Sequence, residues 1–575
     1  MRKKMIAMAL LITLTVATAG CGRADRIRQA REDKAREEES GDEPEMKNEE
    51  APSSGENADK GNADEAVADQ VVAEEEYDGR PEIVLLKKSR YETTGYDEYK
   101  ELFNGSFATP ILSERSAKLY PQLAKSMEDD GKTELEFFDA TSDEYLETAK
   151  VEYAENGEYF YGPYTLNQGV NVKRADEMIV SVFFPVESYM GGAHGSYGNG
   201  YVNYETQTGK VLKLADVLTS MTDLPGILQS ELEKKYAGQL DMFWDLKESL
   251  ANYVDGESFS EGDDYYTGYT WAFTYEGIEF YFGPYELAAY AAGDQSVVLR
   301  YDEYSSLIRP EYLPDKSVTR GRIVDAVMGM PGLDVNNDGV EDQVYLEYGY
   351  DDDWNVNSAS ITYNDETLSV GDDGDIPDYS DINCYLVETA DGRHYAYVIS
   401  QEYDDYIGLH VYDLNSGHIK EVGVRYLVRP ILGYDENDYA LYKECALYDP
   451  ENMYFASRFH FISTFSTIRN YHVGPDGMPV SDDEVYEVAS EASWEPITCV
   501  KDFEADFVGE DGSLTKDTIK AGETFDLLRT DGETWLDART SDGRVVRLQI
   551  KGEGMELTVN GIDAQELFKE LMYAG

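Results

Sequence analysis

One histidine of this chain lies in a glycine-rich stretch where it could do chemistry. Residues 189–210 read YMGGAHGSYGNGYVNYETQTGK, and His194 is one of only 6 histidines. A general base needs a partner within hydrogen-bond reach, and a zinc site needs three or four ligands; no second histidine and no cysteine lies nearby. Gly191, Gly192 and Gly195 supply the backbone freedom of a tight turn. The sequence therefore favours a structural, hydrogen-bonding role for His194 over a ligand or a base.

Known catalytic patterns are missing from the rest of the sequence. It contains no Gly-x-Ser-x-Gly elbow and no His-Glu-x-x-His pair. An enzyme interpretation would have to rest on His194 and on a nearby carboxylate such as Glu187. We expect no catalytic residue, and the enzyme stays open as an alternative.

A second stretch has the spacing of a calcium loop. Residues 334–342 read DVNNDGVED, which places Asp334, Asn336 and Asp338 at loop positions 1, 3 and 5, Val340 at position 7 and Asp342 at position 9. In EF-hand-like loops the side-chain oxygens and the carbonyl at position 7 converge on Ca²⁺. The bidentate glutamate of position 12 is replaced here by a tyrosine, and an acidic turn without metal is the alternative. We predict a calcium site at these five residues.

The start of the sequence predicts export and lipid attachment. A basic start and a short apolar run over residues 5–16 are typical of a signal peptide. Residues 18–21 read TAGC, which resembles the lipobox of bacterial lipoproteins although Thr18 replaces the usual leucine. Residues 1–21 are then the signal peptide. We expect a lipid on Cys21 to hold the protein on the outer face of the bacterial cytoplasmic membrane.

Charge and composition narrow the classes of partner. The formal net charge is −66, which disfavours nucleic acid and favours basic proteins or cations. Residues 22–80 are acidic and poor in aromatic residues, so we expect a disordered tether there. Apart from Cys21, the cysteines are Cys384, Cys445 and Cys499; their number is odd, so at most one disulfide can form among them.

Hydrophobic periodicity predicts the elements that would position these residues. Residues 82–88 and 177–186 read as strands, and residues 91–104, 113–128, 224–236 and 241–253 read as helices. Residues 149–168 read as a hairpin that turns at Asn156-Gly157. We expect residues 82–315 to form an α/β domain.

Two motifs of this region resemble a known family. After Gly-Gly-Ala-His-Gly come Asn203, Thr208-Gly209-Lys210 and Leu214-x-Asp216-x-Leu218. The second motif is an apolar run followed by Pro284-Tyr285-Glu286 and a Tyr290-Ala291 pair. Both resemble the extracellular domain of unknown function of RsiV-type anti-sigma factors, which also precedes the catalytic domain of PdaC-type deacetylases.

The resemblance implies a receptor. The RsiV-type domain binds lysozyme, so the family motif residues Gly191, Gly192, His194, Gly195, Tyr285 and Tyr290 would face or shape a ligand site. The deacetylase relatives carry their Asp and His metal ligands on a separate domain, and no such set follows residue 312. The chain also lacks a sigma-binding segment, so binding can carry over from the family and direct sigma-factor sequestration cannot.

The remainder of the chain predicts β structure. Residues 316–490 are rich in tyrosine and alternate like strands, and would form a β-rich domain around the calcium loop. Residues 491–575 have short strands with Asp-Gly turns, which predicts an SH3-like barrel closed by a helix over residues 563–572. We therefore expect a multidomain, non-catalytic surface lipoprotein that binds lysozyme or a peptidoglycan component. A peptidoglycan-remodelling enzyme, or an accessory subunit of one, is the alternative.

Overall fold

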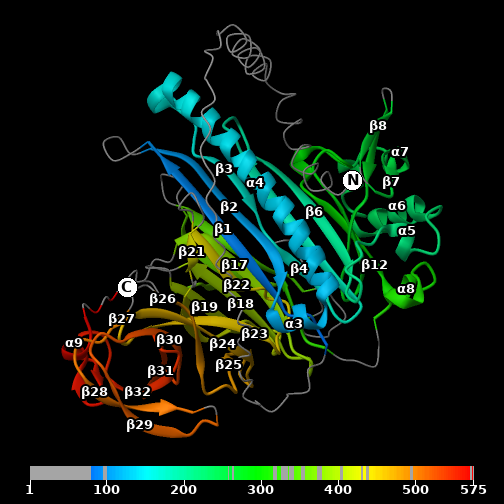
Figure 1. Ribbon diagram of the computed structural model, residues 1–575. Helices are drawn as coiled ribbons and strands as arrows, with labels where there is room; N and C mark the ends of the chain where they lie inside the picture. The colour runs from blue at the N-terminus through cyan, green and yellow to red at the C-terminus, as the bar shows by residue number, and fades with distance from the viewer. Residues whose placement is uncertain are drawn as a thin grey trace, which may run out of the picture. The chain divides into compact units, whose positions relative to one another are not determined.

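The computed structural model describes residues 79–575, which cluster as one compact unit (Figure 1). Within this range the structure does not describe residues 95–99, 257, 262–263, 315–319, 326–334, 336–341, 351–355, 372–377, 402–405, 429–430, 435–439, 492–496, 510, 570, 572 and 574–575. The predicted signal peptide, Cys21 and the tether lie outside the described residues. No helix in the described part of the chain is long and apolar enough to span a bilayer.

The first sheet carries the glycine-rich stretch. Its strands are β1 (Ile83–Thr93), β2 (Glu101–Leu112), β3 (Tyr164–Gln168), β4 (Asn171–Ala175), β5 (Ile179–Tyr189) and β6 (Ser196–Glu205). The expected strands at 82–88 and 177–186 are confirmed. The helix expected over 91–104 is wrong, because β1 and β2 pair antiparallel across this segment with Tyr91 opposite Asn104.

Two strands from a much later part of the sequence extend the same sheet. They are β21 (Ile431–Tyr434) and β22 (Ala440–Cys445), and β22 pairs antiparallel with β1 from Val84↔Cys445 to Lys88↔Leu441. Arg80 and Asp449, both buried, form an ion pair of 2.6 Å beside this junction. The first sheet is therefore completed by the region expected to form the second domain.

A long helix, α4 (Pro121–Asn156), covers one face of this sheet (Figure 1). Leu123 and Met127 pack in one core cluster with the buried β5 residues Val180, Val182 and Phe184. Burying each such side chain contributes about 1.5–3 kcal/mol. The hairpin expected at 149–168 is wrong: Gly157 has φ +55° and terminates the helix, with its N–H bonded to the Tyr153 carbonyl. An Asn-Gly pair suits a helix end as well as a hairpin turn.

A second layer packs on the other face of the first sheet. It contains a small sheet and short helices: β10 (Thr270–Phe273), β11 (Gly277–Phe282), β12 (Gln295–Arg300), α5 (Leu214–Val217), α6 (Leu224–Lys235), α7 (Leu246–Ala251) and α8 (Tyr301–Tyr304). The expected helix at 224–236 is confirmed, whereas the one at 241–253 is reduced to α7 after a 3-10 turn. Smaller strands follow α7: β7 (Tyr253–Val254), β8 (Phe259–Glu261) and β9 (Asp264–Gly268).

The region after residue 320 is built from antiparallel β structure, as expected. Its main sheet contains β13 (Arg322–Asp325), β17 (Asp378–Glu388), β18 (His394–Gln401), β19 (Tyr406–Asp413), β20 (Lys420–Val428), β23 (Met453–His460), β24 (Thr464–Val473), β25 (Pro479–Val480) and β26 (Tyr486–Glu491). A smaller sheet contains β14 (Val344–Tyr350), β15 (Val356–Tyr363) and β16 (Glu366–Ser369). Many tyrosines of the region after residue 320, such as Tyr363, Tyr397 and Tyr412, are fully buried core residues.

The C-terminal strands surround their own core cluster. They are β27 (Ile497–Thr498), β28 (Phe503–Val508), β29 (Leu514–Ile519), β30 (Thr524–Thr530), β31 (Trp535–Thr540), β32 (Val545–Lys551), β33 (Thr558–Val559) and β34 (Ile562–Asp563). Ladders with assigned register join β29, β28, β32, β31 and β30 in that order. The mostly-β prediction is confirmed, but a closed barrel is not established. In place of the expected terminal helix over 563–572, the described residues show one turn, α9 (Ala564–Leu567).

Candidate functional site

The Gly-Gly-Ala-His-Gly segment closes the hairpin between β5 and β6, whose last registered pair is Ser188↔Ser196. Gly191 and Gly192 have φ of +78° and +106°, a region that side chains rarely tolerate. A Cβ on Gly195 would lie 2.9 Å from the Ser188 carbonyl oxygen. The three glycines are therefore required by the turn itself, as the sequence predicted.

His194 lies on the surface and stacks on Tyr290. The two ring centroids are 4.5 Å apart and the rings are inclined by 29°. The His194 Nδ1–H donates to the Gly195 carbonyl at 2.8 Å, and the Tyr290 hydroxyl donates to the same oxygen at 3.3 Å. Among the described residues no carboxylate contacts the imidazole, and Glu187 lies on the outer part of β5 without a bond to it. This arrangement holds a turn and does not form a general-base pair.

Tyr285 follows β11 in a backbone conformation that is rare for its residue type. Its φ is +66°, and its side chain is 47% exposed. A non-glycine residue in this region costs of order 1–3 kcal/mol and persists only when its surroundings hold it. Its ring centroid lies 5.7 Å from that of Tyr290. The second family motif therefore places an exposed aromatic ring beside the His194–Tyr290 stack.

Two further exposed aromatic residues belong to segments whose backbones contact the two motifs. The Tyr161 carbonyl lies 3.6 Å from the position of a Cβ on Gly191, and the Tyr161 ring is 75% exposed. The backbone N–H of Trp244 donates to the Leu287 carbonyl, two residues after Tyr285, and Trp244 is 50% exposed. We call the exposed rings that contact one another, His194, Tyr285 and Tyr290, the aromatic surface.

Carboxyl and phenol groups lie directly behind the aromatic surface. We call this set the acidic tyrosine cluster; its members are Tyr197 on β6, Tyr281 on β11, Tyr253 on β7, and Glu286 and Asp294 in the segment between β11 and β12. The Tyr197 ring meets the Tyr290 ring edge-on at 5.7 Å, which joins the cluster to the surface. Apart from Glu286, which belongs to the second motif, these residues were not predicted from the sequence, because a Tyr in a strand or a single acid in a loop carries no pattern of its own.

The cluster shifts the pKa of its acids upward. Burial raises the pKa of the Glu286 carboxyl to about 7, although the Tyr253 hydroxyl donates to it at 2.6 Å. Burial of the Asp294 carboxyl raises its pKa, although hydrogen bonds with the Tyr281 and Tyr197 hydroxyls lower it in part. Asp294 in turn contributes to the upward shift of the Glu286 pKa. Two carboxyl groups that disfavour ionisation together are common at binding and catalytic sites.

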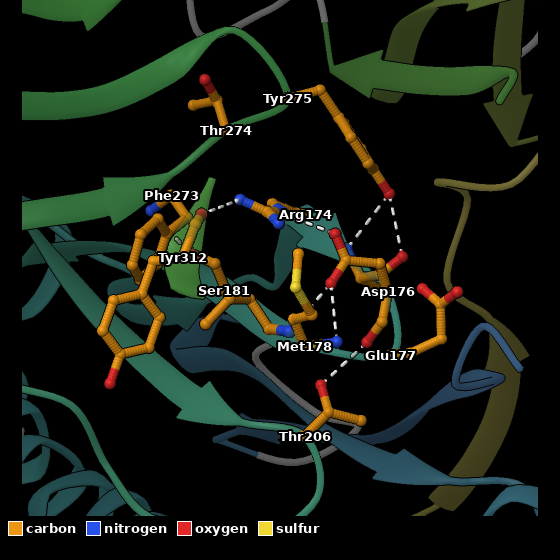
Figure 2. A network of polar contacts seen from close by, with 12 residues as sticks. Arg174, Asp176, Glu177, Met178, Ser181, Thr206, Phe273, Thr274, Tyr275 and Tyr312 are labelled. Carbon is orange, nitrogen blue, oxygen red and sulfur yellow. Dashed lines mark hydrogen bonds and ion pairs between the residues drawn. The ribbon is translucent and has the colours of Figure 1, made fainter. Parts of the chain in front are cut away.

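A buried polar network holds the turn between β4 and β5, at the end of β5 opposite the glycine turn (Figure 2). Arg174 on β4 has no exposed surface; its Nε donates to Asp176 at 2.6 Å and its Nη1 to the Tyr301 hydroxyl at 2.9 Å. Its Nη1 also reaches the Tyr312 carbonyl at 3.3 Å. The remaining carboxylate oxygen of Asp176 accepts the Met178 and Ile179 N–H groups. A buried ion pair of this kind specifies geometry more than it adds stability.

The other family motif residues tie the two layers together. Asn203 on β6 accepts from the Ser181 hydroxyl and donates to the Trp271 carbonyl at 3.0 Å on β10. A Cβ on Gly209 would lie 2.4 Å from the Gln122 carbonyl oxygen of α4. Lys210 pairs with Asp216 at 2.9 Å. Their roles are structural, and they fix where the aromatic surface can form.

Most of the predicted calcium loop lies outside the described residues, including Asp334, Asn336, Asp338 and Val340. Asp342 is described and is buried. Its two carboxylate oxygens accept from the Val335 N–H at 2.7 Å and the Asn364 side chain at 2.6 Å. Within the described part of the chain no group of three or more potential ligands is arranged for a metal. Calcium stays a prediction.

Of the cysteines whose side chains are described, Cys384 and Cys499 are free and buried. They do not pair with each other. Burial raises the pKa of both thiols, which lowers their reactivity. The side chain of Cys445 lies outside the described residues.

Together the layers define a mostly-β protein with several sheets, in which a small α/β layer carries the candidate site. Residues 215–302 match a family described as "Protein of unknown function (DUF3298)". The chain therefore carries a DUF3298 domain, and this segment includes Trp244, Tyr285 and Tyr290 but not the glycine turn. No curated protein matches the chain.

Two solved structures of that family are similar in part. One is a DUF3298 family member from Bacteroides fragilis, with 18% identity and a TM-score of 0.32, covering 41% of this chain and 96% of its own. The other is a DUF3298 family protein from Pseudomonas aeruginosa, with 17% identity and a TM-score of 0.26, covering 40% of this chain and 97% of its own.

Proposed function

We propose that this protein is a non-catalytic, lipid-anchored cell-surface receptor that binds a basic protein, lysozyme, at the cell wall. The observation that carries the proposal is the aromatic surface, where Tyr285 is held exposed in a strained conformation next to the His194–Tyr290 stack. Large rigid aromatic side chains are the usual anchors of protein interfaces. The resemblance of both sequence motifs to RsiV-type domains supports lysozyme as the ligand.

Charge supports the same class of ligand. A net charge of −66 attracts a basic protein over long distances and speeds its encounter. The attraction between exposed charges is screened by salt, with a Debye length of about 10 Å at 0.1 M. Binding that depends on the aromatic surface must therefore persist at high salt, where this attraction is screened.

Calorimetric titration of the chain without residues 1–21 with a basic C-type lysozyme tests the proposal, at low salt and at 0.5 M salt. We expect saturable binding of unit stoichiometry that persists at high salt. Tyr285→Ala should weaken it by at least about tenfold, as for a residue at an interface centre. Tyr426→Ala is the matched control, because Tyr426 is a 56% exposed tyrosine on β20. Binding that vanishes with salt, or that both variants weaken equally, overturns the proposal.

Anchoring and calcium belong to the proposal and are tested separately. Cys21→Ser should release the protein from membranes into the medium, and retention of the variant contradicts lipid attachment. Ca²⁺ titration should raise the melting temperature of the chain, and replacing Asp334 and Asp338 by asparagine should abolish that shift. We also propose that the C-terminal strands form an SH3-like module that contacts the wall.

A second candidate function is wall-polymer hydrolysis, which the raised pKa of Glu286 favours. A carboxyl with a pKa of about 7 can act as a general acid near neutral pH. Release of soluble fragments from purified peptidoglycan, lost in Glu286→Gln, would establish this activity. We place it second, because no arrangement of His194 with a carboxylate supports catalysis in the described residues.

A further inference from the structure

We propose that the β region after residue 320 carries a second ligand site, in which Arg425 and Arg469 hold the terminal carboxylate of a short peptide. The two arginines come from β20 and β24, and the rings of Tyr471 and Tyr486 lie beside them. This site belongs to a different sheet from the one that carries the glycine turn. The inference therefore goes beyond the proposed lysozyme binding and does not depend on it.

The first argument is that the two guanidinium groups meet at one aromatic ring. The guanidinium carbon of Arg425 lies 4.9 Å from the ring centroid of Tyr471, and that of Arg469 lies 5.6 Å from the same centroid. Arg469 also lies 4.5 Å from the ring centroid of Tyr486. An aromatic face attracts a cation within about 6 Å of its centroid. Because β23 separates β20 from β24 in the sheet, only the fold brings these two cations to one place.

The second argument is that hydroxyl groups join the guanidinium groups. Burial raises the pKa of the Tyr471 hydroxyl and the neighbouring Tyr486 phenol raises it further, whereas Arg425 and Arg469 lower it in part. Both arginines are therefore within electrostatic reach of the Tyr471 hydroxyl, which shares a hydrogen bond with Tyr486. Guanidinium groups can only donate hydrogen bonds, and phenol hydroxyls can donate them too. Such a set of groups suits an oxyanion.

The third argument is that neither guanidinium group forms an ion pair among the described residues. The Nε of Arg469 donates to the Ser481 hydroxyl at 2.7 Å, and Arg425 contacts the face of Tyr471. This is unusual in a chain with 115 acidic and 49 basic residues. Most other arginines in the described part of the chain do pair with an acid, among them Arg80, Arg174, Arg322, Arg544 and Arg547.

Acids that lie close to this site along the chain have other partners. Asp476 accepts a backbone N–H of its own turn at 3.1 Å, and Asp482 lies 3.5 Å from the ring nitrogen of His472. Glu487 follows Tyr486 directly, but in the sheet it lies opposite Arg529. The two guanidinium groups are therefore left for an anion from outside the chain.

The donors and the net charge together select the ligand. A guanidinium group donates two parallel N–H bonds to a carboxylate or a phosphate. A chain with a net charge of −66 repels ligands that carry many negative charges, so the site suits a single carboxylate. Tyr486 is partly exposed, and its ring offers apolar surface to the residue that bears the carboxylate.

Equilibrium dialysis of the chain lacking residues 1–21 with radiolabelled N-acetyl-alanyl-alanine tests the site, and the C-terminal amide of this dipeptide is the uncharged probe. We expect saturable binding of the acid at millimolar concentrations and no binding of the amide. Arg425→Gln and Arg469→Gln should each weaken binding at least about tenfold, because each removes charge-assisted hydrogen bonds. Arg539→Gln is the matched control, because Arg539 is exposed on β31 and forms no ion pair among the described residues.

A further variant covers the case in which an arginine variant loses its fold. Tyr486→Phe removes one hydroxyl and keeps the ring, so it should weaken binding a few-fold at an unchanged melting temperature. Unchanged affinity in a folded Tyr486→Phe, together with unfolded arginine variants, overturns the site.

The remaining outcomes are distinct. Binding of the acid that both arginine variants lose and Arg539→Gln keeps supports the site. Equal binding of acid and amide, equal losses in all three arginine variants, or no saturable binding overturns it. Inorganic phosphate that displaces the labelled dipeptide at lower concentration than the unlabelled dipeptide overturns the assignment to a carboxylate. Lysozyme titration of Arg425→Gln should match the wild type, so a failure of the proposed function is recognised separately.

Discussion

Glu134 allows a quantitative test of the packing between α4 and the first sheet. This residue is 5% exposed, and the Gln168 side chain donates to its carboxyl at 3.0 Å. Burial raises its pKa to about 8, the hydrogen bond from Gln168 lowers it in part, and Asp130 raises it further. The folded protein therefore holds a proton on Glu134 at neutral pH that the unfolded chain, with a pKa near 4.5, does not.

The sign of the effect follows from this proton. Between pH 4.5 and pH 8 the folded state binds more protons than the unfolded state, so stability falls as pH rises. With these two pKa values the Glu134 contribution should fall by about 2 kcal/mol between pH 6 and pH 8. Glu134→Gln keeps an acceptor for Gln168 and removes the titration, so it should lose that fall.

Hydrogen exchange of peptides from α4 measures the effect locally, after correction for the intrinsic pH dependence of exchange. Relative to Glu134→Gln, the wild type should show about a thirty-fold greater increase in the opening equilibrium from pH 6 to pH 8, the equivalent of 2 kcal/mol. Glu136→Gln, exposed on the same helix, should behave like the wild type. Identical pH profiles for the wild type and Glu134→Gln would refute the argument that this acid is buried in its neutral form.

Three further predictions follow from single residues. Asn203→Ala should lower the free energy of unfolding in urea by about 2–3 kcal/mol, because it leaves buried polar groups on two layers unpaired. Gln207→Ala, at an exposed position, should leave the free energy of unfolding unchanged, and equal effects of the two variants would contradict the bridging role of Asn203. Cys384 should resist alkylation in the folded protein and react in urea, and mass spectrometry that finds it labelled without denaturant would contradict its burial. Tyr285→Gly should stabilise the chain by roughly 1 kcal/mol by relieving its positive φ, while Tyr285→Ala should not; both should weaken lysozyme binding.

Hydrophobic periodicity predicted the elements whose own residue pattern allows one structure only. It failed where the same residue pattern is compatible with two kinds of secondary structure. The apolar run at 177–186 could only be a buried strand, and β5 is buried on both sides. Asn156-Gly157 suits a hairpin turn, yet it ends α4, because tertiary packing of Leu146 and Ala149 continues the helix up to it. The segment 91–104 has helical spacing, yet pairing across β1 and β2 overrides it.

The candidate site was predictable in part for a similar reason. Glycines with positive φ leave a signature in sequence, so the turn at Gly191 and Gly192 was expected. Asp294 was not, because burial raises its pKa and hydrogen bonds with Tyr281 and Tyr197 offset part of the rise, and these two phenols come from two other strands. Only the packing of the small sheet on the first sheet brings those phenols to one place.

The junction between β1 and β22 leads to a last prediction, about where this protein can be divided. The boundary expected at residues 315–316 separates β1 from the strand that covers it. Lys87 on β1 pairs with Glu444 on β22 at 2.5 Å, and the Ile83 N–H donates to the Tyr448 hydroxyl at 3.2 Å. A fragment of residues 82–315 would expose this edge together with the apolar groups beneath it.

Unpaired edges of this kind promote association between chains. We therefore expect residues 82–315 to aggregate or dimerise in size-exclusion chromatography, whereas residues 79–575 stay monomeric. Adding residues 428–452 as a separate peptide should restore part of the monomer, because it supplies β22 and the Asp449 partner of Arg80. A monomeric 82–315 fragment with an unchanged melting temperature would show that β22 is dispensable. The domain that binds the ligand would then end at residue 315, and the strands supplied from residues 431–445 would be an accessory cover of its sheet.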